Sequence, residues 1–383
     1  MVDSAADSYH IGLNALLLSP GQATYRSAGI HNYMSGLLPH LPAADDRFTY
    51  TAFVVSDQPG LDSTIRQQSA GSRLSPLARI AWEQFVQPVL GARVHLQLLH
   101  SMAFVSPLIT TTPSVVTVYD LSFHRMPNRF QRSRRAYLSI FTRLSCRRAR
   151  RIIAISKHTK KDIVSVFNVP SDRIDVVYPG CDSLFQRVGE KAVAEFRRQR
   201  GLPEKFLLYL GTIEPRKNLS ALITAFAKLR PEGIKLVCAG GRGWMYEDVF
   251  QTVEELHLSR DVIFPGFVPR EELPLWYSAA HAFVYPSSYE GFGVPVLEAM
   301  ACGAPTITTN SSSLPEVAGD AAHLVPPDDS DALAAALNEI LTKRDLRTQL
   351  SSRGPQRARL FTWLVAARLT AQTYAHALGL DEG

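Results

Sequence analysis

Cysteine, long apolar runs and a leader-like start are all scarce or missing in this sequence of 383 residues. The four cysteines are widely separated, with no C-x-x-C pair and no histidine at metal-binding spacing, which argues against a disulfide framework or a metal site. No apolar run approaches the roughly 20 residues that span a bilayer. Residues 1–8 are polar and acidic, unlike a secretory signal. We therefore expect a cytoplasmic protein with reduced thiols and no bound metal.

The composition has no extremes. Apolar residues make up 46% and charged residues 20% of the chain, close to the average of globular proteins. These values exclude a disordered, collagen-like or coiled-coil protein. At about 100–200 residues per domain, the length predicts two domains, each large enough for its own core.

Acidic side chains are absent from one long stretch. Thirteen basic residues and no Asp or Glu lie between Arg125 and Lys161. The whole chain has a net charge of +6, so the rest of it, with 28 basic and 35 acidic side chains, has a net charge of −7. The sequence thus predicts one local basic surface on an otherwise acidic protein.

Short apolar runs alternate with helical patterns along the whole chain. Several runs are continuous Leu, Val and Ile, as in parallel strands covered on both faces. We predict strands at 9–18, 48–55, 94–100, 115–120, 151–155, 174–178, 206–211, 235–239, 262–265, 282–285, 305–308 and 322–325. Helices are predicted at 218–229, 271–280, 331–342 and 358–378. This alternation is typical of the α/β class with doubly wound sheets.

A polar stretch at 183–203 interrupts the pattern, and the strands restart at Phe206. We place the domain boundary near residues 183–190. The predicted organisation is an N-terminal domain at 1–185, a C-terminal domain at 186–357 and a terminal helical segment at 358–383.

Two cations stand where a buried strand is expected to lead into a helix. In L-G-T-I-E-P-R-K-N-L at 210–219, Arg216 and Lys217 lie beside the exposed N–H groups of the helix start. Helix dipole and charge-assisted hydrogen bonds there both favour a phosphate or diphosphate. The alternative is a solvated Arg–Lys pair at an ordinary helix start.

Two carboxylates follow the predicted strand 282–285. Gly291 and Gly293 allow close approach of backbone to a ligand, and Pro295 suits the first turn of a helix running to about residue 301. Glu290 then lies in the loop and Glu298 on the helix, where each can accept hydrogen bonds from a different diol, as on a ribose and a hexose. The alternative is a glutamate that stabilises the helix dipole beside an incidental surface glutamate.

The segment E-G-F-G-V-P-V-L-E-A-M-A-C-G-A-P, which begins at Glu290, resembles the donor-site signature of the retaining GT-B glycosyltransferases of family GT4. The resemblance covers most of 206–331, including G-T-I-E-P-R-K-N and G-G-R-G-W, and is looser in the first half at 27–30, 115–123, 154–156 and 178–180. These forms look most like mannosyltransferases that build bacterial surface polysaccharides such as lipopolysaccharide.

The resemblance implies two Rossmann-like doubly wound domains facing across a cleft, with the terminal helix crossing back to the first domain. The second domain would hold a nucleotide-sugar donor and the first an acceptor. By position, it implies that Arg216, Lys217 and Gly29 contact the donor diphosphate and that Gly211 also lies in the donor site. Glu290 would contact the sugar, helped by backbone groups of Phe292, Gly293 and Val294. Glu298 would contact the ribose, and Phe267 and Val268 the base.

Two positions depart from the family pattern. Many members have a histidine where this chain has Tyr119, and a tyrosine cannot become cationic near neutral pH. Asp120 or His124 could share that role, or backbone groups could suffice. Thr212 stands where the family often has an arginine, so neutralisation of the diphosphate would rest more on Arg216 and Lys217.

Retaining members of the family are thought to need neither a protein nucleophile nor a metal, because a donor phosphate oxygen takes the acceptor's proton. This chain has no D-x-D motif beside a strand. We expect no cofactor beyond the donor. Breaking the anomeric bond leaves negative charge on the departing diphosphate, which two fixed cations stabilise.

The basic stretch contains an apolar stripe, Tyr137, Ile140, Phe141 and Leu144, at helical spacing. We expect this stripe to pack on the first sheet. The density of arginine around it exceeds what solubility needs, and an anionic membrane surface attracts each such cation by about 1 kcal/mol. Nucleic acid is a poorer candidate partner because no recognition motif accompanies the charge.

The sequence thus predicts a metal-independent retaining transferase that moves a hexose onto a lipid-linked or surface-polysaccharide acceptor. The first choice of hexose is mannose, with GDP-mannose as the donor. The expected location is the inner face of the plasma membrane. The alternatives are transfer of glucose, galactose or rhamnose from a UDP or dTDP donor, a GT-B nucleotide-sugar epimerase, and a non-catalytic basic adaptor.

Overall fold

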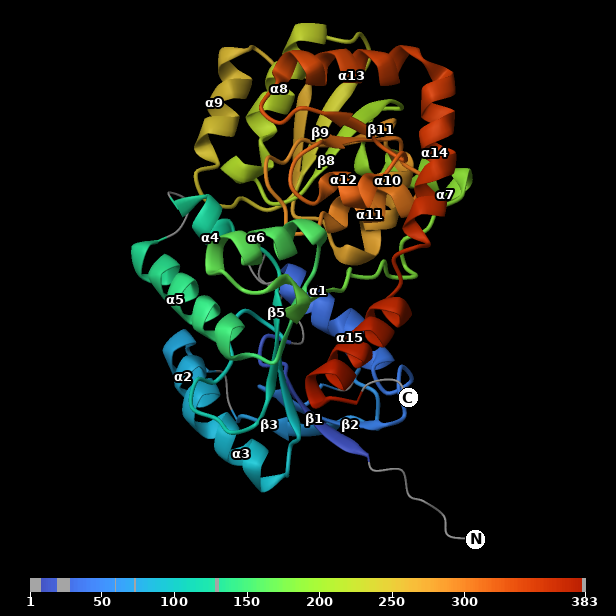
Figure 1. Ribbon diagram of the computed structural model, residues 1–383. Coiled ribbons are helices and arrows are strands. Elements are labelled where there is room, and N and C mark those ends of the chain that lie inside the picture. The colour runs from blue at the N-terminus through green and yellow to red at the C-terminus, as the bar shows by residue number, and fades with distance from the viewer. Residues whose placement is uncertain (1–7, 19–27, 59, 72–73, 128–130, 381–383) are drawn as a thin grey trace. The chain divides into compact units, whose positions relative to one another are not determined.

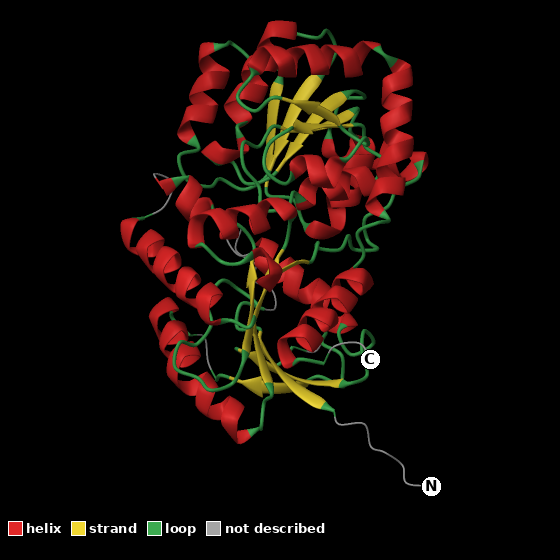
Figure 2. Cartoon of the chain, in the orientation of Figure 1, coloured by secondary structure: helices red, strands yellow, loops and turns green. Residues whose placement is uncertain are grey.

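A computed structural model of the chain describes residues 8–18, 28–58, 60–71, 74–127 and 131–380. The chain forms two compact units, the first of residues Met1–Gly180 and Thr362–Gly383 and the second of Cys181–Phe361. Each unit has its own parallel sheet with helices around it (Figures 1 and 2). The units divide at 180 and 361, where the sequence predicted 185 and 357.

The first unit alternates strands and helices. Its strands are β1 (Tyr9–Asn14), β2 (Phe48–Val54), β3 (Arg66–Ser69), β4 (Leu98–Ser101), β5 (Ser114–Val118), β6 (Arg151–Ala154) and β7 (Ile174–Val176). Its helices are α1 (Ala28–Leu37), α2 (Pro76–Ala81), α3 (Gln87–Arg93), α4 (Ser122–Arg125), α5 (Arg132–Arg148), α6 (Lys157–Phe167) and α15 (Trp363–Leu378). Shorter turns are η1 (Leu38–His40), η4 (Ser171–Arg173) and the π-helical η2 (Trp82–Val86).

The second unit has the same alternation. Its strands are β8 (Phe206–Leu210), β9 (Lys235–Ala239), β10 (Val262–Gly266), β11 (Ala282–Tyr285), β12 (Thr306–Thr309) and β13 (His323–Val325). Its helices are α7 (Glu190–Arg200), α8 (Leu219–Leu229), α9 (Glu247–Glu255), α10 (Leu273–Ala279), α11 (Val294–Ala301), α12 (Leu314–Ala318), α13 (Ser330–Thr342) and α14 (Arg344–Ala358), with 3-10 turns η5 (Pro215–Lys217) and η6 (Arg270–Glu272).

The strand orders explain why both units are Rossmann-like. In the first sheet the order is β3-β2-β1-β4-β5-β6-β7, and in the second it is β10-β9-β8-β11-β12-β13, with every pairing parallel. In each unit the winding direction reverses beside the first strand, between β1 and β4 and between β8 and β11. Open sheets of this kind bind ligands outside the carboxyl ends of the strands at this switch point. The predicted fold class of two doubly wound domains is confirmed.

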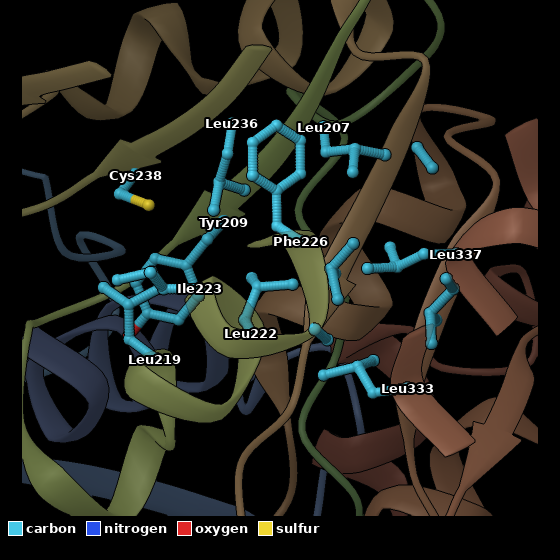
Figure 3. Close-up of a cluster of buried hydrophobic side chains, with 14 of the residues drawn as sticks. Leu207, Tyr209, Leu219, Leu222, Ile223, Phe226, Leu236, Cys238, Leu333 and Leu337 are labelled. Atoms are coloured by element: carbon cyan, nitrogen blue, oxygen red, sulfur yellow. The ribbon is translucent and has the colours of Figure 1, made fainter. Parts of the chain in front are cut away.

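The second sheet is covered by a continuous apolar core. Tyr209 on β8 and Leu236 on β9 pack with Leu222 and Phe226 of α8 and with Leu337 of α13 (Figure 3). All five are essentially buried.

The C-terminal helix α15 is part of the first unit. It packs against β4, β5 and β6, and against α1. The Tyr374 hydroxyl lies 2.7 Å from Nδ1 of buried His100, and the other ring nitrogen of that histidine lies 2.8 Å from the Thr117 hydroxyl. Gly36 permits the helix to approach closely, since a Cβ there would lie 2.1 Å from the ring of Trp363. Buried polar contacts thus fasten the last helix to the first sheet.

Two features of the first unit differ from the sequence predictions, an edge strand and the packing of α5. Strand β3 was missed, because its residues Arg66–Ser69 are polar and exposed at an edge of the sheet. The apolar stripe of α5 packs only in part: Tyr137 and Phe141 are half-buried, whereas Ile140 is 55% exposed and Leu144 is also exposed. The fully buried side chains of α5 are Thr142, Ser145 and Cys146.

No helix in the described part of the chain is both long and apolar enough to cross a membrane.

Candidate active site

The carboxyl ends of β8 and β11 carry the residues predicted to bind a diphosphate and a sugar. Arg216 and Lys217 lie in η5, which follows β8, and Glu290 lies in the loop after β11. A backbone hydrogen bond joins the two loops: Ser288 N donates to the Arg216 carbonyl over 2.9 Å. Because β8 and β11 are neighbours at the switch point, residues over 70 positions apart in sequence meet there.

Glu290 accepts hydrogen bonds on both carboxylate oxygens. Lys217 Nζ lies 2.6 Å from Oε1, and Arg216 donates to Oε2 over 2.9 Å. The hydroxyls of Ser287 and Tyr285 also donate to Oε1, over 2.7 and 3.0 Å, and Lys217 contacts the same tyrosine hydroxyl. Glu290 is only 7% exposed, so this is a preorganised and largely dry charge cluster. The solvated Arg–Lys pair that the sequence left open is therefore not what the structure contains.

A second carboxylate balances the cluster. Arg216 Nε donates to Glu214 over 2.7 Å, in addition to its contact with Glu290. Two cations and two carboxylates are thus fixed within one pair of loops. Glu214 was not singled out from the sequence, although it stands two residues before Arg216 in the same motif.

Burial and charge compete in setting the pKa values of the cluster. Burial alone would raise the pKa of Glu290, but the Arg216 and Lys217 charges and the hydrogen bonds from Lys217 and Ser287 outweigh it and lower that pKa to about 2. The pKa of Lys217 is lowered, first by burial and then by the like charge of Arg216, against the opposing effect of Glu290. The charged carboxylate is therefore the stable form of Glu290 across the physiological pH range.

The loop after β12 holds the backbone of Glu290 by hydrogen bonds. The Ser312 hydroxyl accepts a hydrogen bond from Glu290 N over 2.8 Å, and the Ser313 hydroxyl donates to the carbonyls of Glu290 and Phe292. Gly293 takes a φ of +110°, and a Cβ there would lie 2.7 Å from Leu314. Only glycine fits this position without strain, and it leads directly into α11 at Val294.

Glu298 lies on α11, as predicted, and is as buried as Glu290. Its Oε2 accepts a hydrogen bond from the Tyr277 hydroxyl over 3.0 Å. Burial raises the pKa of Glu298 to about 7; the Tyr277 hydrogen bond and the Arg270 charge oppose this, and Asp182 adds to it. Among the described residues, no cation lies in hydrogen-bond contact with this carboxyl, in contrast to Glu290.

Phe267 and Val268 follow β10 and line a cavity of about 250 Å³ together with Trp276 and Arg200. Phe267 is 75% exposed, an unusual position for a large apolar side chain. Gly211, at the end of β8, donates its N–H to the Ala239 carbonyl over 3.0 Å. These residues lie in the same unit as Glu290 and Glu298.

The remaining predicted residues belong to the first unit. The Tyr119 hydroxyl donates to the Met102 carbonyl over 2.8 Å, and burial raises the pKa of Tyr119 well above its usual value. Asp120 accepts a hydrogen bond from Ser122 N over 2.8 Å at the start of α4. Gly29, which the resemblance implies as a diphosphate contact, lies in the first turn of α1. Among the described residues, no group of three or more His, Cys, Asp or Glu is placed to hold a metal ion.

Comparison with known proteins places these features in a family. The family described as "Glycosyltransferase Family 4" matches residues 29–183, and "Glycosyl transferases group 1" matches residues 192–357. The O-antigen chain mannosyltransferase B of Escherichia coli is 35% identical over 265 residues, which are 68% of this chain and 70% of that protein. The chain belongs to the GT-B glycosyltransferases of family GT4.

Two further likenesses extend this finding. The serotype-specific mannosyltransferase WbdA of Escherichia coli is 31% identical over 238 residues, covering 60% of this glycosyltransferase, which spans only 29% of WbdA. The structure of a sucrose-phosphate synthase from Thermosynechococcus elongatus superposes with a TM-score of 0.75 at 23% identity, covering 97% of this chain and all of that one. The second likeness concerns the fold alone.

Sequence reasoning missed the side chains that hold the charged residues of this glycosyltransferase. Tyr285 and Ser287 orient Glu290, and Tyr277 orients Glu298. Ser287 follows β11 closely, so its place near Glu290 could have been anticipated. Tyr277 lies in an apolar helix, where nothing in the local sequence distinguishes it from a core residue.

Proposed function

We propose that this glycosyltransferase moves a mannosyl group from GDP-mannose, with retention, onto a lipid-linked or surface-polysaccharide acceptor. The observation that carries the proposal is the buried Glu290 carboxylate held by Arg216 and Lys217 at the switch point of the second sheet. The choice of mannose is supported by the names of the two Escherichia coli relatives and by the G-T-I-E-P-R-K-N form of the loop.

The proposed reaction exchanges one bond at the anomeric carbon for another. The bond to the diphosphate oxygen breaks, a bond to the acceptor oxygen forms on the same face, and the acceptor's proton passes to a donor phosphate oxygen. Arg216 and Lys217 stabilise the charge that develops on the departing diphosphate. Lys217 is buried, and charge interactions are stronger where water is excluded. No step of this scheme requires a metal or a protein nucleophile.

The carboxylates of the second unit have separate roles in the proposal. Glu290, fixed by four neighbours, accepts hydrogen bonds from hydroxyls of the transferred sugar. Glu298 accepts from the ribose, and the hydrogen bond that it accepts from Tyr277 on Oε2 leaves it acceptor capacity for a diol. Phe267 and Val268 contact the base beside the cavity that they line.

The proposal includes contact with an anionic membrane through α5. Arg143, Arg147 and Arg148 are exposed on this helix together with Ile140 and Leu144. Exposed apolar side chains among arginines are typical of helices that lie at a membrane surface. Part of the basic stretch is already occupied within the protein, since Arg125 pairs with Asp162 and Arg151 pairs with Asp175. The proposal assigns the membrane contact to the exposed arginines of α5.

Turnover of GDP-mannose tests the proposal. Release of GDP from GDP-mannose in the presence of a mannose-terminated glycolipid should fall by about 10²–10³-fold in Lys217→Ala and in Glu290→Gln. Lys228→Ala, which removes an exposed lysine of the same unit, is the matched control and should retain the wild-type rate. Excess EDTA should leave the rate unchanged. Wild-type turnover in both site variants, with their melting temperatures preserved, would contradict the proposed site.

A further inference from the structure

Side chains of the protein use most of the hydrogen-bonding capacity of the Glu290 carboxylate. A carboxylate has about four lone-pair sites on its two oxygens. Oε1 accepts from Lys217 over 2.6 Å and from the hydroxyls of Ser287 and Tyr285 over 2.7 and 3.0 Å. Oε2 accepts from Arg216 over 2.9 Å. Hydroxyls of a sugar therefore reach Glu290 by replacing one or more of these donors.

The two cations that hold Glu290 are the same two that the proposed reaction assigns to the donor diphosphate. Lys217 pairs with Glu290, and Arg216 pairs with both Glu290 and Glu214. Two cations and two carboxylates give this cluster a formal charge of zero. A diphosphate that binds here must therefore draw the cations away from carboxylates with which they already pair.

The transferred sugar compensates the carboxylate for that loss. In the proposed function, hydroxyls of the hexose donate to Glu290, so they can replace Arg216 and Lys217 when these turn to the diphosphate. A nucleoside diphosphate without a sugar brings no such hydroxyl. Glu290 is only 7% exposed, so its carboxylate would then lose charge-assisted hydrogen bonds without replacement.

We propose that Glu290 competes with the diphosphate for Arg216 and Lys217, and that this competition makes the site prefer a nucleotide sugar to the nucleoside diphosphate left after transfer. While the hexose occupies Glu290, both cations are available to the diphosphate. Once the hexose has been transferred, Glu290 pairs with both cations again and weakens binding of the product. The assignment of sugar and diphosphate rests on the proposed function, whereas the competition rests on the contacts of Glu290.

The uncharged neighbours of the pair allow this exchange without a large movement. Lys217 Nζ contacts the Tyr285 hydroxyl and lies 4.8 Å from the centre of the same ring, so a cation–π contact remains when the lysine leaves Glu290. Ser287 continues to donate to Oε1, and the Ser313 hydroxyl donates to the Glu290 carbonyl over 2.9 Å. Only hydrogen bonds change partners in this exchange.

Isothermal titration calorimetry of the full-length protein with GDP and GDP-mannose tests the competition. Glu290→Gln keeps the shape of the side chain and removes the charge that competes for the cations. We expect GDP to bind this variant at least tenfold more tightly than the wild type, because its diphosphate no longer displaces a carboxylate. GDP-mannose loses its contact with a charged acceptor and should gain less. The preference for GDP-mannose over GDP should therefore fall at least tenfold.

Glu214→Gln separates this role from the general effect of removing a negative charge. Glu214 contacts the same arginine over 2.7 Å, but the proposed function gives it no contact with the sugar. Affinities for GDP and GDP-mannose should therefore rise by the same factor, so their ratio stays at the wild-type value. Glu254→Gln, which changes an exposed carboxyl of the same unit, should alter neither affinity.

Melting temperatures show whether Glu290→Gln remains a valid test. The variant leaves the buried Lys217 without its carboxylate, so it should melt below the wild type in the absence of nucleotide. GDP should raise its melting temperature more than it raises that of the wild type. The wild type supplies an independent measurement, since it should bind GDP-mannose more tightly than GDP.

Three results would overturn the competition. One is GDP binding by folded Glu290→Gln that is no tighter than that of the wild type. Another is an equal change of the affinity ratio in Glu290→Gln and Glu214→Gln. The third is a wild type that binds GDP at least as tightly as GDP-mannose.

Failure of the proposed function gives a different pattern. UDP and UDP-glucose are titrated alongside as a second pair of probes. A Glu290-dependent ratio for the UDP pair, with no binding of the GDP pair, would contradict the proposed donor and retain the competition. Loss of GDP-mannose turnover in Glu290→Gln with an unchanged ratio would retain the proposed function and overturn the competition. Binding of neither pair by the wild type would contradict both.

Discussion

Glu290 and Glu298 are equally buried, yet their pKa values move in opposite directions. Two cations contact Glu290, so its charged form is favoured despite burial and its pKa falls to about 2. Among the described residues, Glu298 has a hydrogen bond from the Tyr277 hydroxyl and none from a cation, so burial prevails and its pKa rises to about 7. The number of neighbouring cations, rather than depth, decides which carboxylate stays ionised.

The raised pKa of Glu298 predicts a specific dependence of stability on pH. The unfolded chain loses this proton near its ordinary pKa of 4.5, whereas the folded chain keeps it until about pH 7. Stability should therefore fall as pH rises from about 4.5 to 7, by up to about 3 kcal/mol, and then level off. In Glu298→Gln this fall should disappear.

Melting temperatures at pH 5, 6, 7 and 8 measure this effect. Glu298→Gln should melt close to the wild type at pH 5 and above it at pH 8. Glu254→Gln, which changes an exposed carboxyl of the same unit, should follow the wild type throughout. Parallel curves for the wild type and Glu298→Gln would show that Glu298 is ionised at every pH tested.

At the scale of single elements, a buried hydrogen bond between the Tyr374 hydroxyl and His100 joins α15 to the first sheet, in addition to their packing. Tyr374→Phe removes the hydroxyl beside His100 Nδ1 and leaves that nitrogen unpaired in a fully buried place. We expect a loss of about 1–3 kcal/mol in stability, the usual cost of an unsatisfied buried polar group. Differential scanning calorimetry should show it as a lower melting temperature, while Gln372→Ala on the exposed face of α15 should show no change. An unchanged melting temperature in Tyr374→Phe would mean that packing alone holds the helix.

The helix α5 should bind anionic vesicles through both charge and apolar contact. Arg147→Gln with Arg148→Gln should lower the partition coefficient onto phosphatidylglycerol vesicles about tenfold or more, at about 1 kcal/mol for each cation. Ile140→Ser with Leu144→Ser should weaken binding as well. Arg344→Gln with Arg359→Gln removes the same charge from exposed places in the second unit and should have little effect. Cosedimentation measures all three, and equal losses in the two arginine pairs would refute a role specific to α5.

The elements differ in how far the sequence could predict them. Strands such as β9 and β11 were predicted with their observed bounds, because their apolar runs are buried on both faces and end in glycine or polar loops. The packing of the stripe on α5 was predicted only in part, since Ile140 and Leu144 are exposed. Its periodicity indicates which side chains share a face and not how much of that face is covered. The contacts of Asn14 with Glu83 and Gln87 join residues about 70 positions apart, and no local pattern reports such a meeting.

At the scale of the whole molecule, the same winding is used twice. Each unit has its switch point beside its first strand, and each collects buried polar groups there. The groups differ in charge: the second unit has two cations and two carboxylates, while the first has the amides of Asn14 and Gln87, the hydroxyl of Ser101 and the carboxylate of Glu83. The net charge of +6 likewise divides into a basic stretch in the first unit and an acidic remainder.

The donor site is tested most directly by thermal-shift measurements with GDP, UDP and dTDP, since a ligand that binds only the folded state raises its melting temperature by mass action. GDP should give the largest rise, and that rise should be lost in Lys217→Ala and kept in Lys228→Ala. Comparable rises with all three nucleotides would contradict the choice of GDP. A rise with GDP that survives in Lys217→Ala would contradict the site itself.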